Sequence, residues 1–187
     1  MITHKLIAAC WIVFLTYWLI NARSTKKTVE RKSLAAIIAH RIPFTFGALL
    51  LFLPVSLSPW NPLVVPHTLM MKAISVGLCV LGLLGAIWSR RTLAKNWSSE
   101  VVFKETHELV ERGPYRFVRH PIYTSLLLMA LGTALATGRP TALGGFLLIV
   151  AGLCMKLKLE EELMLRHFPT QYAAYKSRVK TLIPFAW

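Results

Sequence analysis

The sequence predicts an all-α protein that crosses a lipid bilayer with about five helices. Of its 187 residues, 55% are hydrophobic and only 16% are charged, and the mean hydropathy is +0.53. Soluble domains carry about 25% charged residues. The low charge content and the long apolar runs therefore indicate that much of the surface faces lipid.

Five apolar runs approach the length of about 20 residues that a helix needs to cross about 30 Å of hydrocarbon. They are Leu6 to Ile20, Ile42 to Leu57, Thr68 to Trp88, Ile122 to Thr137 and Ala142 to Leu159. Several runs are short, so we expect tilted helices or snorkelling ends. The last run contains Lys156 and Lys158, whose long stems can carry their charges to the interface.

Basic residues gather in alternate loops, and this pattern predicts the orientation. Lysines and arginines fill the first loop (23–32), the third loop (90–119) and the C-terminal tail, whereas loop 58–66 has none and loop 138–140 has one. The positive-inside rule then places the N-terminus outside, and the first and third loops and the C-terminus in the cytoplasm. This alternation requires an odd number of spans, in agreement with five.

Several other functions are not indicated. The net charge of +14 comes from residues that flank the apolar runs, where anionic membrane lipids account for them, so we expect no nucleic-acid partner. Cys10, Cys79 and Cys154 lie singly within apolar runs, so no metal site and no disulfide framework is predicted. Glycines at 82, 85, 144 and 145 are expected to be points of close helix packing.

The third loop ends in a segment that predicts a binding site at the cytoplasmic face. Gly113-Pro114 is a turn signal, and His120-Pro121 is typical of a helix start because proline suits the first helical position. A helix that begins there presents N–H groups and the positive end of its dipole. A ligand carboxylate is a suitable partner for such a terminus.

A cluster of acids is expected to lie beside this segment. All eight acids are glutamates, and three of them, Glu160 to Glu162, are consecutive. The short turn at 138–140 makes the last two spans antiparallel neighbours, which brings His120 and Glu161 to one level. Taken singly, Arg119 fits an interfacial cation, Tyr123 an aromatic belt and the glutamates a solvated turn. The expected proximity of all these residues favours a shared binding or catalytic site.

These motifs resemble the isoprenylcysteine carboxyl methyltransferase family and its phospholipid N-methyltransferase relatives. The resemblance rests on Glu-Leu-Val-Glu-Arg-Gly-Pro-Tyr-Arg-Phe-Val-Arg-His-Pro-Ile-Tyr, on the later Glu-Glu-Glu-Leu and on tail residues near Pro184-Phe185, and it covers about Trp88 to Phe185. It implies an integral-membrane enzyme that uses S-adenosylmethionine and releases S-adenosylhomocysteine. It also implies one membrane domain over residues 1–187, with an accessory part (1–66) and a catalytic core (67–187).

The resemblance also implies roles for individual residues. Glu161 matches an acid on the side of the methyl acceptor, with Glu160 as its pair. The positions that match the cofactor-binding stretches are His107, Glu108, Leu109, Val110, Tyr115, Arg119, His120, Pro121, Ile122 and Tyr123. Aromatic faces among them are suited to an adenine ring and to a sulfonium.

The acceptor is expected to be a lipophilic molecule that enters from the bilayer, and its reacting group is open at this stage. A C-terminal carboxylate is already ionised at pH 7, because its reference pKa is near 3.5, and it needs no general base. An amine must first lose a proton, which Glu160 or Glu161 would accept. The prenylcysteine branch carries an arginine where this chain has Lys156-Leu157-Lys158, and lysine lacks the bidentate fork that orients a carboxylate.

Three alternatives remain. One is an aminolipid N-methyltransferase. Another is a membrane NADPH-dependent reductase, because some of these enzymes share a His-Pro-x-Tyr segment. The third is a non-catalytic scaffold, which would explain the topology but would leave the His120-Pro121 segment and the glutamate cluster without a role.

Overall fold

The computed structural model describes residues 2–21, 28–31, 33–53, 61–94, 102–104 and 109–184. Helices account for most of this part of the chain, and two short strands pair with each other. In chain order the elements are α1 (Ile2–Asn21), β1 (Thr28–Arg31), α2 (Leu34–Phe52), α3 (Leu69–Leu93), β2 (Val102–Lys104), the 3-10 helix η2 (Gly113–Arg116), α4 (Pro121–Thr137), α5 (Pro140–His167) and α6 (Pro169–Arg178).

Each predicted apolar run corresponds to a helix, but the five helices differ in length. Four of them, α1, α2, α3 and α5, are long and apolar enough to cross a membrane. The fifth, α4, has 17 residues and is shorter than a typical span. The fold is therefore all-helical in its membrane part, with four candidate spans and one shorter apolar helix.

The second helix differs most from its predicted bounds of Ile42 to Leu57. It begins at Leu34, where the Ser33 side chain accepts a hydrogen bond from the Ala36 N–H at 3.3 Å. Such a cap satisfies a free donor at the helix start. It ends at Phe52, and Leu53 is extended because residues before a proline avoid the helical region. The polar pair His40-Arg41 interrupts the apolar run but not the helix, which explains the late predicted start.

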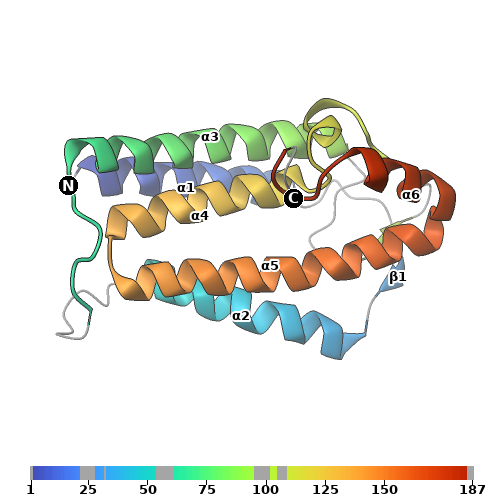
Figure 1. Ribbon diagram of the computed structural model, residues 1–187, viewed down its shortest axis with the longest axis horizontal. Helices are drawn as coiled ribbons and strands as arrows, with labels where there is room; N and C mark the ends of the chain where they lie inside the picture. The colour runs from blue at the N-terminus through green and yellow to red at the C-terminus, as the bar shows by residue number, and fades with distance from the viewer. Residues whose placement is uncertain are drawn as a thin grey trace.

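The helices form two groups, as Figure 1 shows: α1, α3 and α4 lie together on one side, and α2 lies along α5 on the other. Glycines allow close packing in both groups. A Cβ on Gly82 would come within 2.5 Å of the Ser125 carbonyl oxygen, and one on Gly145 within 2.6 Å of the Gly47 carbonyl oxygen. The predicted packing role is thus confirmed for Gly82 and Gly145, whereas Gly144 has open space around it.

Hydrogen bonds between loops show which loops lie together at each end of the bundle. The strands β1 and β2 pair antiparallel, so the first and third loops lie together. The Arg119 N–H donates to the Lys180 carbonyl at 2.8 Å, which adds the C-terminal tail to this end. At the opposite end, the Val64 N–H donates to the Gly138 carbonyl at 2.8 Å. This alternation agrees with the predicted partition of the loops between two sides.

Candidate functional site

A cavity of about 980 Å³ lies between the two helix groups. Its polar end is at the third loop, at the start of α4 and beside α6. From there it follows α4 from Tyr123 to Thr137, a helix length of about 21 Å at 1.5 Å per residue. Most of its lining side chains are apolar or aromatic. The cavity therefore joins a polar site at one end of the bundle to a long apolar space within it.

The start of α4 is fixed by the C-terminal tail. The N–H of His120 donates to the Thr181 carbonyl at 3.1 Å, and the Thr124 hydroxyl donates to the Leu182 carbonyl at 2.7 Å. The helix begins at Pro121 after His120, as predicted. The N–H groups of Tyr123 and Thr124 both donate to the His120 carbonyl. Pro121 has no N–H. Of the first four helical residues, Pro121 to Thr124, this leaves the N–H of Ile122, a residue that lines the cavity.

Arg119 and Glu161 form a buried ion pair at the polar end of the cavity. Arg119 Nη2 lies 2.6 Å from Glu161 Oε1, and the two side chains are 6% and 9% exposed. Nε also donates to Glu161 Oε1. The remaining guanidinium donors bond to the carbonyls of Lys176 and Val179 and to the Thr181 hydroxyl. Arg119 thus links the segment before α4 to α5, α6 and the C-terminal tail.

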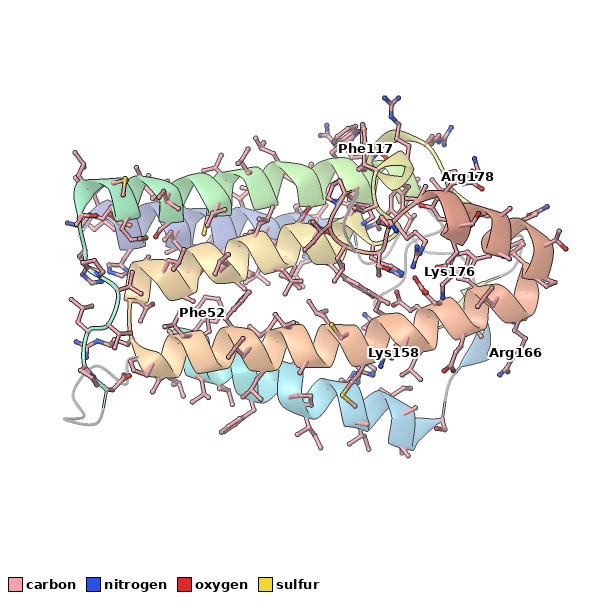
Figure 2. All side chains as sticks on the ribbon, in the orientation of Figure 1. Phe52, Phe117, Lys158, Arg166, Lys176 and Arg178 are labelled. Atoms are coloured by element: carbon pink, nitrogen blue, oxygen red, sulfur yellow. The ribbon has the colours of Figure 1, made fainter. Side chains whose placement is uncertain are left out.

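Both oxygens of Glu161 are directed to basic groups of the protein. Lys176 Nζ lies 2.8 Å from Oε2, and His120 Nε2 lies 3.4 Å from Oε1. Figure 2 shows Lys176 between α6 and α5, whereas Arg166 points away from the bundle. The predicted proximity of His120 and Glu161 is confirmed. Glu161, however, does not line the cavity.

Glu160 is the member of the acid cluster that lines the cavity. Its Oε1 accepts a hydrogen bond from the Tyr123 hydroxyl at 2.5 Å. Lys156 Nζ lies 3.8 Å from the same oxygen and 5.3 Å from the centre of the Tyr123 ring. The His120 ring stacks on Tyr123, with centroids 5.5 Å apart and planes 6° apart. A carboxylate, an ammonium and two aromatic rings therefore meet at the cavity wall.

Three buried tyrosines outside the spans complete the polar end. The Tyr175 hydroxyl donates to the Tyr115 carbonyl at 2.5 Å, which joins α6 to η2. Burial raises the pKa of Tyr115, Tyr172 and Tyr175 above the usual value for a phenol. These hydroxyls therefore stay protonated at neutral pH and do not serve as bases.

The structure brings together most of the residues that the sequence predicts for the site. Eight of them line the cavity: Leu109, Val110, Tyr115, Arg119, His120, Ile122, Tyr123 and Glu160. Pro121 is buried at the helix start. His107 and Glu108 lie outside the described residues.

Sequence reasoning missed the part that α1 and α2 play in the cavity. Trp11, Phe14 and Trp18 of α1 line it, as does His40 of α2. The rings of Trp11 and Phe52 meet with centroids 5.1 Å apart, and this contact joins the two helix groups. The signal available in the sequence was the aromatic content of the first run and a histidine among apolar residues.

The sequence is similar to known membrane methyltransferases. The profile of the phospholipid methyltransferase family matches residues 70–171. Protein-S-isoprenylcysteine O-methyltransferase B of Arabidopsis thaliana is 31% identical over 83 residues, which cover 44% of this chain and 42% of the relative. The Saccharomyces cerevisiae protein-S-isoprenylcysteine O-methyltransferase is 30% identical over 125 residues, which cover 64% of this chain and 52% of the relative. The chain thus spans about half the length of these curated relatives.

A solved structure is similar in fold. It is that of the eukaryotic intramembrane Ras methyltransferase, isoprenylcysteine carboxyl methyltransferase, with a TM-score of 0.52 and 23% identity. The match covers 81% of this chain and 51% of that chain. With the apolar helices, this likeness identifies an integral, multi-pass membrane protein.

Proposed function

The chain belongs to the phospholipid methyltransferase family, and from this premise we propose that it transfers a methyl group from S-adenosylmethionine to a lipophilic carboxylate. The observation that carries the proposal is the cavity, because its polar end holds Glu160, Lys156 and Tyr123 and its apolar part follows α4. A substrate with a polar head and a hydrophobic tail therefore fits this cavity, with its head at the polar end and its tail along α4.

The polar end fits the methyl donor. Tyr115 and Tyr123 offer aromatic faces, and the N–H of Ile122 lies at the positive end of α4. These groups suit the adenine ring and the carboxylate of the donor. When bound, S-adenosylmethionine supplies a methyl group on a positively charged sulfur. The residues that we assign to its binding are Leu109, Val110, Tyr115, His120, Ile122 and Tyr123, with His107 and Glu108 as further candidates from the sequence.

Glu160 and Glu161 receive different roles. Glu160 faces the cavity and holds the Tyr123 hydroxyl and the Lys156 ammonium, so we assign it to the reacting end of the site. Glu161 is bound by Arg119 and Lys176, so it positions His120 and the tail. In this assignment Glu160 takes the acceptor-side place that the family resemblance implied for Glu161.

The chemical demands on the protein are modest if the acceptor is a carboxylate. Such a group is ionised at pH 7 and attacks without losing a proton. Lys156 attracts it, and the apolar walls exclude water. Holding two reactants in line contributes about 7 to 11 kcal/mol in favourable cases. We assign this end of the bundle to the cytoplasmic side, on the basis of the positive-inside rule.

Calorimetry of the purified protein in detergent tests the cofactor. S-adenosylhomocysteine is expected to bind with measurable heat, and NADPH is expected to give none. Binding of NADPH without S-adenosylhomocysteine would instead favour a reductase. Binding of neither would favour a scaffold and would overturn the proposal.

A further inference from the structure

His40 is a buried polar residue in a membrane helix. Its side chain is 6% exposed and lines the cavity. It lies in α2, outside the residues that the family profile matches. Polar groups within a membrane span are costly and most often serve a function. We therefore expect the His40 ring to bind a ligand or a polar partner in the cavity.

The hydrogen bond of His40 determines which nitrogen meets the cavity. Nδ1 lies 3.0 Å from the Ala36 carbonyl, and because a carbonyl only accepts, Nδ1 carries a proton. Nε2 has no hydrogen-bond partner among the described residues and is not among the enclosed polar atoms. This second nitrogen is thus accessible, on a residue that lines the cavity.

Helix packing places His40 beside the polar end of the cavity. A Cβ on Gly152 of α5 would come within 2.9 Å of the His40 carbonyl oxygen, so the two backbones touch there. Lys156 is one helical turn beyond Gly152, and Glu160 is one turn further. Lys156 and Glu160 of α5, with Arg41 on its own helix, are the charged groups near enough to act electrostatically on the His40 ring.

We propose that His40 Nε2 and Lys156 Nζ together bind the carboxylate head of the methyl acceptor. This inference rests on the proposed methyl transfer to a carboxylate. A single lysine lacks the fork with which arginine orients a carboxylate. Two donors on α2 and α5 supply two directions, one for each carboxylate oxygen, and make α2 part of the acceptor site.

The bond from His40 to a carboxylate requires a proton on Nε2. The ring then binds as an imidazolium, with both nitrogens donating. Of the charged groups around the ring, Arg41 and Lys156 disfavour the imidazolium and Glu160 favours it. The carboxylate of the acceptor adds a second negative charge on the favourable side. Acceptor binding is therefore accompanied by proton uptake and weakens as pH rises through the titration of the imidazole.

Two variants of His40 distinguish the role of Nε2 from that of Nδ1. His40→Gln places an amide N–H near the position of Nε2, whereas His40→Asn places one near Nδ1 and leaves the cavity side empty. The probe is N-acetyl-S-farnesylcysteine, with its uncharged methyl ester as the comparison. Quenching of Trp11 and Trp18, which line the cavity, reports binding without turnover. His67→Gln is the matched control, because His67 lies outside the cavity lining.

The wild-type protein is expected to bind the acid at least tenfold more tightly than the ester at pH 6, with a smaller ratio at pH 8. His40→Gln is expected to keep the preference at both pH values. His40→Asn is expected to lose it, while the ester binds as before and the melting temperature stays within a few degrees. A preference that survives His40→Asn, or a wild type that binds acid and ester equally, would overturn the inference.

Failure of the proposed function gives a different result. If S-adenosylhomocysteine does not bind, the methyltransferase proposal is wrong, whatever the acid and ester ratio. If S-adenosylhomocysteine binds and the ester and acid are equivalent, the methyltransferase proposal stands and the role of His40 is wrong. The His67→Gln control must match the wild type in both assays.

Discussion

Arg119 and Glu161 lie in contact at the junction of α4 and α5, with Nη2 and Oε1 separated by 2.6 Å in a buried environment. Lys176 reaches the other oxygen of Glu161 from α6. The segment that follows η2 and the C-terminal tail are thus tied to the acid cluster by one ion-pair network. The network fixes the position of His120, which stacks on Tyr123 at the cavity wall.

Replacement of Glu161 by Gln is expected to destabilise the protein. The change leaves the buried Arg119 guanidinium without its counter-charge, which typically costs about 3 kcal/mol. Thermal unfolding in detergent measures the effect as a lower melting temperature. Glu162→Gln, an exposed neighbour, should change it little. Equal melting temperatures for the Glu161 variant and the wild type would contradict the structural role of this pair.

Replacement of Glu160 by Gln is expected to reduce methyl transfer more than stability. Glu160 is partly exposed to the cavity, and it holds Tyr123 and Lys156 there. Loss of its charge should lower turnover on the order of tenfold, a barrier increase of about 1.4 kcal/mol. Steady-state kinetics with labelled S-adenosylmethionine checks this, together with the melting temperature. Unchanged kinetics would remove Glu160 from the reacting end.

Replacement of Gly152 by Ala is expected to separate α2 from α5. The added methyl group would lie 2.8 Å from the Phe44 nitrogen and 2.9 Å from the His40 oxygen, both backbone atoms that cannot turn aside. We expect a lower melting temperature and a higher KM for the acceptor. Gly144→Ala is the matched control on the same helix, because nothing lies within 4 Å of its added Cβ. Equal effects of the two variants would contradict the close packing at Gly152.

The buried tyrosines predict loss of stability at alkaline pH. Burial raises the pKa of Tyr115, Tyr172 and Tyr175 in the folded state, whereas unfolded phenols ionise near pH 10. Above that pH the unfolded chain binds fewer protons than the folded one, so the free energy of unfolding falls. Melting temperatures should be flat from pH 7 to 9 and fall above about pH 10. A Tyr175→Phe variant, although less stable at neutral pH, should show a shallower fall.

The sequence predicted the parts of the fold that depend on local patterns. Apolar runs identified the helices, and His120-Pro121 identified the start of α4. The short turn at 138–140 implied the hairpin that joins His120 and Glu161. The bounds of α2 were wrong because hydropathy gives no weight to a capping residue such as Ser33.

The division of roles within the acid cluster depends on packing that no sequence pattern encodes. Glu160 and Glu161 are adjacent and identical in type, and successive helical residues point about 100° apart. The direction of each is determined by the cations that contact Glu161, which are Arg119 just before α4 and Lys176 of α6. The same holds for His40, whose place in the cavity follows from glycine contacts between α2 and α5.

Transfer of a labelled methyl group tests the central claim most directly. The purified protein is incubated with labelled S-adenosylmethionine and either N-acetyl-S-farnesylcysteine or phosphatidylethanolamine. Methyl esters release methanol in base, whereas N-methyl groups do not. We predict base-labile label in the prenylcysteine and none in the aminolipid. Base-stable label in the aminolipid, with none in the carboxylate, would contradict the account.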